Sequence, residues 1–90
     1  MAMVIDGKRV CLYMSPTFYE EHKDGKLHYY PGIVTENEPG YNKTDWDWGT
    51  DLEIAQQCAD EYNERNGCSK QEQTEIVMSS FRASRMAGLL

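Results

Sequence analysis

Hydrophobic and polar residues follow two different spacings along this chain of 90 residues. Up to residue 48 the apolar residues come in short runs rich in β-branched and aromatic side chains, separated by turn-forming steps. Such runs are typical of β-strands. Over residues 50–87 the apolar residues recur every three or four positions, as in amphipathic helices. The pattern predicts one domain with a β-rich half over residues 1–48 and a helical half over residues 50–87.

Turn residues divide the first half into candidate strands. Met3–Ile5 and Arg9–Tyr13 flank Asp6-Gly7, a dipeptide that tolerates the positive φ angles of a tight hairpin turn. Ser15-Pro16 ends the second of these strands, because proline cannot donate a hydrogen bond to a sheet. A serine before a proline is also typical of a helix start, so we expect one helical turn from Ser15 through Glu21, with a loop as the alternative.

Two more strands are expected in the first half. A turn over residues 23–26 precedes Leu27–Tyr30, and the β-branched run Ile33–Thr35 follows Pro31-Gly32. The step Asn37–Gly40 then leaves the sheet through a turn. Together these signals predict an α+β fold, with a small antiparallel sheet of three to four strands followed by two packed helices.

The first predicted helix has a clear beginning and end. Thr50 and Glu53 have the spacing of a capping box, in which each side chain accepts a backbone N–H at the helix start. Gly67 supplies the left-handed conformation in which many helices end. The apolar face between them consists of Leu52, Ala55, Cys58, Ala59 and Tyr62.

A second helix follows after a short loop. Ser69 and Glu72 repeat the capping-box spacing at its start. Its inward face consists of Ile76, Val77, Ser80, Phe81 and Ser84. The segment Thr74–Met78 is rich in β-branched residues, so a strand is the alternative for these positions.

The formal net charge is −6, from 15 acidic and 9 basic residues. Binding to DNA or RNA rests on Lys and Arg displacing counterions from phosphates, so direct nucleic-acid binding is not expected. An acidic protein is instead attracted to basic surfaces, which include the nucleic-acid channels of nucleases. The other interpretation is that the charge keeps an ordinary acidic domain soluble, with no partner implied.

Length and cysteine content limit the class of protein further. A chain of this length buries about 64% of its unfolded surface, so its core is small and self-association into a homo-oligomer is an expectation. Cys11, Cys58 and Cys68 are odd in number and form no Cys-x-x-Cys pair, so no disulfide framework or zinc site is indicated. This usage fits the reducing cytoplasm, and no apolar run has the length to span a membrane. We expect Cys58 to be a small buried hydrophobic residue.

Four acidic residues before and within the first predicted helix have some of the spacing of a calcium loop. Asp45, Asp47, Asp51 and Glu53 offer oxygen ligands, yet the sixth position counted from Asp45 is Thr50, where such loops have glycine. Capping and charge-matching of the helix start is the favoured interpretation of these carboxylates.

Other motifs that carry chemistry are weak in this chain. His22 and His28 are the only histidines, and they form a metal site only if a hairpin brings them together. No nucleophile motif and no glycine-rich phosphate loop is present. We therefore expect no enzyme activity, no metal and no cofactor.

The segment Tyr29–Trp48 gathers both tryptophans and three of the six tyrosines. Such side chains combine a flat apolar face with a polar edge, which suits a binding surface. The contact candidates are Tyr30, Glu36, Glu38, Tyr41, Asp47 and Trp48. For Trp46 and Trp48 the alternative is packing between the sheet and the first helix, because a small domain needs large residues in its core.

Three runs of the sequence resemble a known group of proteins. The runs are residues 28–41 (HYYPGIVTENEPGY), residues 44–49 (TDWDWG) and residues 76–80 (IVMSS). Over residues 28 to 82 the chain resembles short uncharacterised proteins encoded by bacteriophages and integrated mobile elements. That group has no assigned activity, so the resemblance implies only a context. Small acidic phage proteins often bind and block a host factor, including CRISPR nucleases and other defence components, and some sequester nucleotide signals.

We therefore expect a non-enzymatic, phage-encoded binding protein of the host cytoplasm that inhibits a bacterial protein with a basic surface, such as a CRISPR nuclease. The alternative is a protein that sequesters a small nucleotide-like ligand between aromatic faces. The cations that such a ligand needs are few, namely Lys8, Arg9, Lys43, Arg82 and Arg85. A metal-dependent hydrolase built on Asp45 and Asp47 is a third hypothesis.

Overall fold

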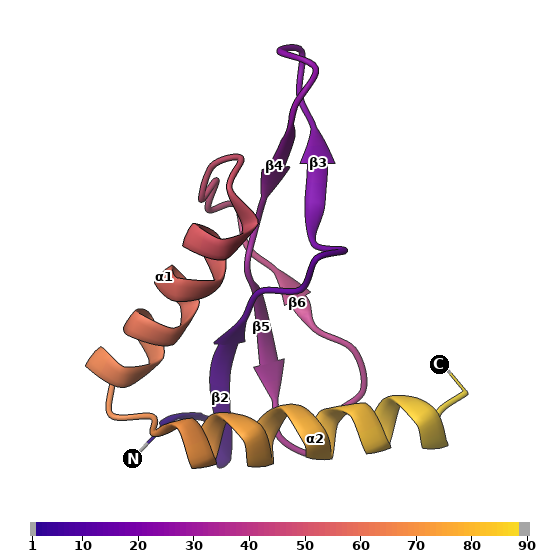
Figure 1. Ribbon diagram of the computed structural model, residues 1–90. Helices are drawn as coiled ribbons and strands as arrows, with labels where there is room; N and C mark the ends of the chain where they lie inside the picture. The colour runs from indigo at the N-terminus through magenta and orange to yellow at the C-terminus, as the bar shows by residue number, and fades with distance from the viewer. Residues whose placement is uncertain (1, 89–90) are drawn as a thin grey trace.

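The computed structural model describes residues 2–88 of the protein (Figure 1). Its first element is an antiparallel hairpin. The hairpin joins β1 (Met3–Ile5) to β2 (Lys8–Tyr13). Asp6 and Gly7 form the turn, with φ angles of 52° and 78°. Positive φ at both central residues is what a type I′ hairpin turn requires. The predicted hairpin is confirmed.

Two further strands complete a four-stranded antiparallel sheet in the order β1-β2-β5-β6. β5 spans Gly32–Thr35 and β6 spans Asn42–Lys43. A separate hairpin of β3 (Tyr19–Glu21) and β4 (Leu27–Tyr29) extends away from this sheet, at the top of the view in Figure 1. The predicted α+β fold, with a small antiparallel sheet followed by two packed helices, is confirmed.

The segment after β2 differs from the helical turn expected from Ser15 through Glu21. A tight turn around Pro16 is closed by the Phe18 backbone N–H, which donates to the Ser15 carbonyl at 3.0 Å. The chain then enters β3, whose residues pair with β4. The helical prediction is wrong for Tyr19–Glu21, because cross-strand pairing outweighs the local helix-start signal.

α1 (Leu52–Arg65) begins one residue later than the sequence predicts. Its N-cap is Asp51, whose Oδ1 accepts the Ile54 backbone N–H at 3.2 Å. Thr50 lies outside the helix, so the predicted capping box of Thr50 and Glu53 is wrong. Aspartate caps as well as threonine does, and it also places a negative charge at the positive end of the helix dipole.

α2 (Lys70–Met86) begins where the sequence predicts. Ser69 is its N-cap and accepts the Glu72 backbone N–H at 3.1 Å. The strand alternative for residues 74–78 is wrong, because all of them lie inside α2. Gly67, between the helices, has a φ of 82°, the left-handed conformation expected there.

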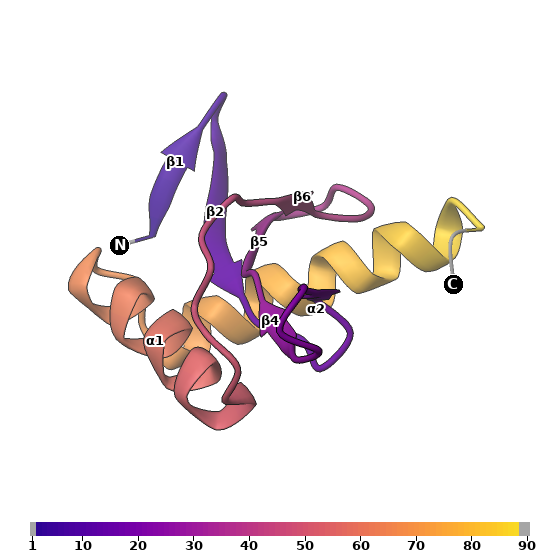
Figure 2. The same cartoon turned by 90° about the horizontal axis from the view of Figure 1, so that it is seen from above.

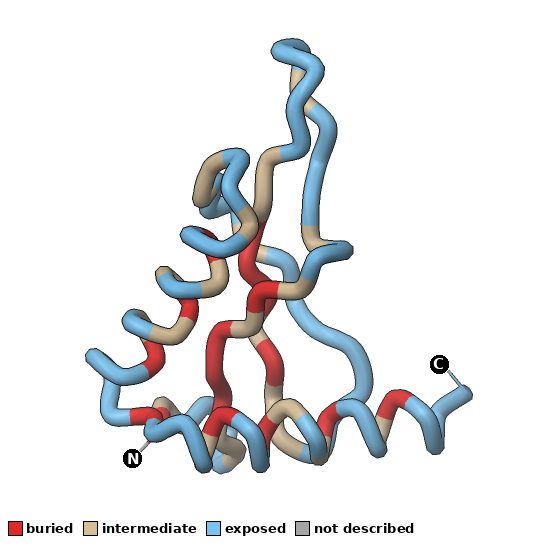
Figure 3. Tube along the Cα trace, in the orientation of Figure 1, coloured by how far each residue is buried: buried red, intermediate tan, exposed pale blue. Residues whose placement is uncertain are grey.

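β2 is buried on both faces because the two helices contact it from opposite sides. Successive side chains of a strand point to opposite faces of the sheet. Cys11 packs with Val34 and with Ile76 of α2, whereas Leu12 packs with Ala55 of α1. Seen from above, α1 lies beside β2 and α2 runs beneath the strands (Figure 2). Figure 3 shows the resulting buried stretch along β2.

A buried asparagine joins α1 to the open edge of β2. β1 pairs with Lys8–Val10, so no strand within residues 2–88 lies beside Leu12 on that edge. The Asn63 side chain takes the place of a strand, because its Oδ1 accepts the Leu12 N–H at 2.8 Å and its Nδ2 donates to the Leu12 carbonyl at 2.9 Å. Asn63 is only 2% exposed, so both bonds are shielded from water.

Three serines of α2 hold the loop between β5 and β6. Ser79 and Ser84 accept the backbone N–H groups of the first and last residues of the loop 37–40, at 3.0 and 2.8 Å. Ser80 donates to the carbonyl of residue 38 at 2.7 Å. These bonds explain why Ser80 and Ser84 are buried on the inward face of α2.

Asn63→Ala is expected to destabilise the protein by roughly 2–6 kcal/mol, because it leaves two buried backbone groups without partners at about 1–3 kcal/mol each. Urea unfolding followed by circular dichroism would measure the change. Glu64→Ala is the matched control, since it alters the exposed neighbour on the same helix and should stay within about 0.5 kcal/mol of wild type. Equal losses in the two variants would contradict the role given to Asn63.

Asp51→Ala is expected to lower the free energy of unfolding by about 1 kcal/mol, the usual effect of removing an N-cap. Thr50→Ala should have almost no effect, because Thr50 is exposed and lies outside α1. Thermal melting of the two variants side by side would test this. A larger loss from Thr50→Ala would show that the helix begins at the earlier position.

Candidate functional site: an aromatic and acidic surface

The predicted contact residues do not form one continuous surface. Glu36 and Glu38 follow β5, where Glu36 is bonded to Arg9 of β2 and the Glu38 carbonyl is bonded to Ser80 of α2. Asp47 and Trp48 lie in the loop 44–51, which leads from β6 to α1. Figure 1 shows this loop at the opposite end of the sheet from α2. The segment Tyr29–Trp48 therefore contributes to two separate regions of the protein.

Glu36 is held by Arg9 and serves the fold. Its carboxylate accepts the Arg9 backbone N–H and lies 3.2 Å from Arg9 Nε. Arg9 also pairs with Glu72 and Glu75 of α2, at 3.5 and 3.0 Å. These bonds, the backbone N–H first among them, hold the pKa of Glu36 below its ordinary value. Glu36 thus helps to join β2 and β5 to α2.

Tyr30 is buried, in contrast to the surface position expected of a contact residue. It is 8% exposed, and its hydroxyl lies 2.7 Å from Nε2 of His22. Lys43 Nζ lies 4.9 Å from the centre of the Tyr30 ring and pairs with Glu20 at 2.9 Å. Tyr30 is placed where the β3–β4 hairpin joins the main sheet, so its ring supports the hairpin.

Tyr41 presents only one face of its ring. The other face stacks on Phe18, with ring centroids 3.9 Å apart and an angle of 24° between the rings. Gly32 lies under the same ring, and a Cβ at this position would come within 2.6 Å of Tyr41 Cδ2. Only glycine fits there. Tyr41 is 47% exposed, so it is a surface residue in a fixed orientation.

Trp46, Trp48 and Tyr62 form what we call the aromatic platform. The Trp46 ring lies 6.2 Å from that of Trp48 and 5.7 Å from that of Tyr62 on α1. Trp48 and Tyr62 are half-buried and pack against the core cluster around Leu12. Trp46 is 43% exposed. Trp48 therefore supports the platform, while the exposed ring belongs to Trp46, which is not among the contact residues predicted from the sequence.

Two carboxylates of the loop 44–51, those of Asp47 and Asp51, accept backbone N–H groups nearby in the chain. Asp47 Oδ1 accepts the Gly49 N–H at 2.8 Å, the largest cause that holds the pKa of Asp47 below its ordinary value. Asp51 caps α1, which confirms the capping interpretation for that residue. The group of metal-type ligands found among residues 2–88 includes neither Asp45 nor Asp51, so a calcium loop gains no support.

Two histidines meet on the β3–β4 hairpin, the condition under which the sequence allows them to form a site. The rings of His22 and His28 stack with centroids 3.7 Å apart and an angle of 8°. Asp24 lies 2.7 Å from Nε2 of His28, and Asp47 lies 2.9 Å from Nδ1. The bond to Asp24 is the largest cause that raises the pKa of His28 above its ordinary value. His22, Asp24, His28 and Asp47 therefore form one polar cluster.

The three cysteines are free thiols in different surroundings. Cys11 lies in the core, and burial raises its pKa to about 12. Its thiol therefore stays neutral and serves packing. Cys58 on α1 is half-buried, so the expectation that it is a buried hydrophobic residue holds only in part.

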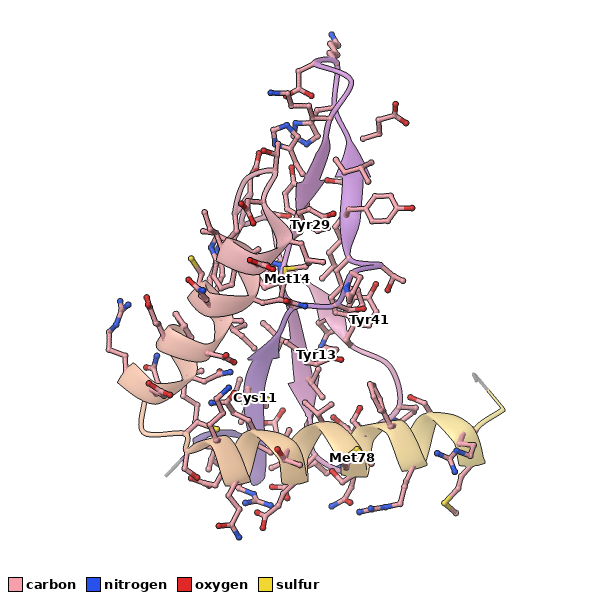
Figure 4. All side chains as sticks on the ribbon, viewed as in Figure 1. Cys11, Tyr13, Met14, Tyr29, Tyr41 and Met78 are labelled. Atoms are coloured by element: carbon pink, nitrogen blue, oxygen red, sulfur yellow. The ribbon has the colours of Figure 1, made fainter. Side chains whose placement is uncertain are left out.

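An open groove of about 470 Å³ separates α1 from α2. Tyr13 and Met14 at the end of β2 and Met78 on α2 give it an apolar lining (Figure 4). Lys70 also lines the groove, but it pairs with Asp60 at 3.0 Å. The groove therefore offers little to a phosphate group.

Lys8, Arg9 and Lys43, three of the five cations suited to a phosphate-bearing ligand, are paired with carboxylates. Lys8 pairs with Glu38 at 3.4 Å, and Arg9 is held by three carboxylates. A second hollow of about 490 Å³ beside Tyr30 is lined by one ammonium, that of Lys43, and by two carboxylates, those of Glu20 and Asp45. Its charge disfavours a nucleotide.

Comparison of the chain with models of known protein families, with curated proteins and with solved structures finds no match to any of them. Within residues 2–88 no helix has both the length and the apolar character needed to cross a bilayer.

Glu36→Gln is expected to lower the free energy of unfolding at neutral pH and to make it less dependent on pH in the acid range. The pKa of Glu36 is depressed in the folded state, so its contribution is present above the ordinary glutamate pKa of about 4.3 and is lost as the pH falls through the lower folded value. The difference in free energy of unfolding between wild type and Glu36→Gln should become smaller as the pH falls through that range. Urea unfolding at a series of pH values would measure it, with the exposed Glu61→Gln as control. A difference independent of pH would contradict this assignment.

Proposed function

We propose that the protein is a non-enzymatic binding protein whose aromatic platform recognises arginine side chains on the basic surface of another protein. The observation that carries the proposal is the exposed Trp46 ring, which rests on Trp48 and Tyr62 in one orientation. A ring that is already oriented loses little conformational freedom on binding, which favours affinity.

The charges near the platform suit the same partner. Asp45 and Asp47 flank Trp46 in the chain, and both are exposed. A guanidinium group stacks on the face of an indole while its N–H groups donate to a carboxylate at the edge. The net charge of −6 adds attraction to a basic surface at longer range.

The partner we propose is a nucleic-acid-binding protein of a bacterial host, such as a CRISPR nuclease. Channels that bind phosphates are rich in arginine and lysine, so they present the side chains that the platform suits. An acidic protein seated in such a channel blocks it by charge complementarity and needs no catalytic group. Binding at the platform would therefore amount to inhibition of the partner.

Trp46→Ala is expected to weaken binding of a synthetic arginine-rich peptide roughly tenfold. A cation–π contact contributes about 0.5–2 kcal/mol, and about 1.4 kcal/mol corresponds to a factor of ten. A lysine-rich peptide of equal length and charge should bind wild type less tightly, because an ammonium group does not stack on the ring as a guanidinium does. Isothermal titration at low salt would give both dissociation constants.

Tyr19→Ala is the matched control for Trp46→Ala. Tyr19 is 47% exposed and lies on β3, outside the platform, so its loss should leave peptide binding unchanged. Equal weakening by both substitutions, or no preference for arginine over lysine, would refute the proposal.

Wild-type and Trp46→Ala proteins would also serve as paired baits in bacterial lysate, where only wild type should recover a basic partner. A nucleotide retained in native mass spectrometry would favour the sequestering alternative instead.

A further inference from the structure

The pairing of β3 with β4 brings the two histidines together. Glu20 lies opposite His28 in this hairpin, and His22 lies two residues beyond Glu20 on the same face. His22 and His28 are therefore diagonal neighbours across the strands, close enough for their rings to touch. The His22 backbone N–H donates to the Lys26 carbonyl at 3.0 Å, which closes the hairpin next to the pair.

Both nitrogens of His28 face carboxylates. Asp24 is 2.7 Å from Nε2, and Asp47 is 2.9 Å from Nδ1. A neutral imidazole has only one N–H, so both bonds form only when the ring carries two protons or when a cation replaces one of them. A metal ion is such a cation, and histidine nitrogen with carboxylate oxygen is a donor set that zinc and its neighbours bind.

We propose that His22, His28 and Asp47 bind a divalent transition-metal ion of the zinc class. Each of the three offers a ligand atom, and these atoms all lie within 4.8 Å of one another. His28 would bind through Nδ1, the nitrogen beside Asp47. Asp24, on the opposite nitrogen, would accept the remaining N–H and so orient the ring, as carboxylates commonly do behind metal-bound histidines.

The surrounding contacts place these ligands on well-supported elements. The Tyr30 hydroxyl is bonded to Nε2 of His22 and holds that ring. Asp47 Oδ1 is bonded to the Gly49 N–H, which leaves Oδ2 directed toward His28. His22 directly follows β3, His28 lies in β4, and Asp47 comes from the loop 44–51. A bound ion would therefore fasten the projecting hairpin to the segment that leads into α1.

Binding of a metal ion requires the ligand side chains to move. Zinc lies about 2.0–2.1 Å from histidine nitrogen and about 2.0–2.2 Å from carboxylate oxygen, so tetrahedral ligand atoms are about 3.3 Å apart. The lone pair of an imidazole nitrogen lies in the ring plane, and two nearly parallel rings cannot both direct lone pairs at one ion. One of the two rings must rotate out of the stack between His22 and His28. The metal site shares Asp47 with the surface proposed to bind arginine, but it does not include Trp46, so the metal tests and the Trp46→Ala test can fail separately.

Cobalt titration of the untagged protein tests the site. The protein is first treated with EDTA and exchanged into chelator-free buffer, and Co²⁺ is then added at neutral pH. The expected result is visible absorption of low-symmetry Co²⁺ that saturates at one ion per chain and is abolished by Zn²⁺. His22→Ala, His28→Ala and Asp47→Asn should each remove this absorption, and Asp24→Asn should weaken Co²⁺ binding about ten- to hundredfold. Asp45→Asn, the matched control in the same loop, should bind like wild type.

A second measurement uses the fact that the chain has only two histidines. In NMR spectra of the wild type, Zn²⁺ should shift the ring C–H signals of both, and EDTA should reverse the shift. Zn²⁺ should also raise the melting temperature, since it binds the folded state. The proposal is overturned if cobalt gives no absorption, if only one histidine responds to Zn²⁺, or if Cys58→Ser rather than His28→Ala removes binding.

Discussion

The side-chain amide of Asn63 is the contact on which the rest of the structure depends. β1 ends its pairing at Val10, so the edge of β2 at Leu12 would otherwise carry an unpaired donor and acceptor inside the protein. An asparagine amide offers the same donor and acceptor as a peptide group, so it can stand in for a neighbouring strand. Its two bonds fix the rotation of α1, and this rotation places the preceding residue, Tyr62, beneath Trp46. The aromatic platform therefore owes its position to a polar contact in the core.

The parts of the fold that could be predicted from the sequence depend on residues close together in the chain. The Asp6-Gly7 turn and the Ser69 cap are local, and both appear in the structure. The start of α1 moved to Asp51 because two adjacent residues are both good caps and propensity does not choose between them. β3 was missed because its conformation is decided by β4, which lies beyond a turn. Asn63 was missed because polar residues on a helix are expected to face water.

The candidate site was less predictable because it depends on which side chains are exposed. Residue type singled out the aromatic segment, but contacts distant in sequence decide which rings face solvent. Phe18 covers one face of Tyr41, and α1 covers Trp48, so Trp46 is left as the exposed tryptophan. The approach of His22 to His28 depends on the register of β3 against β4. A slip of one residue would move every side chain of a strand to the other face of the hairpin. Their placement on either side of an Asp-Gly turn was the one signal in the sequence that indicated this approach.

The serine contacts of α2 have a consequence for how this protein can change over evolutionary time. The bonds of Ser79, Ser80 and Ser84 to the loop 37–40 go to its main-chain atoms, so the anchoring does not depend on which side chains the loop carries. Positive φ angles restrict the first and last residues of the loop, Asn37 and Gly40. The two positions between them are exposed and can accept substitutions while the backbone keeps its path. Selection acting on this surface could therefore vary its chemistry at little cost to folding, with the helix serines as the part that must be retained.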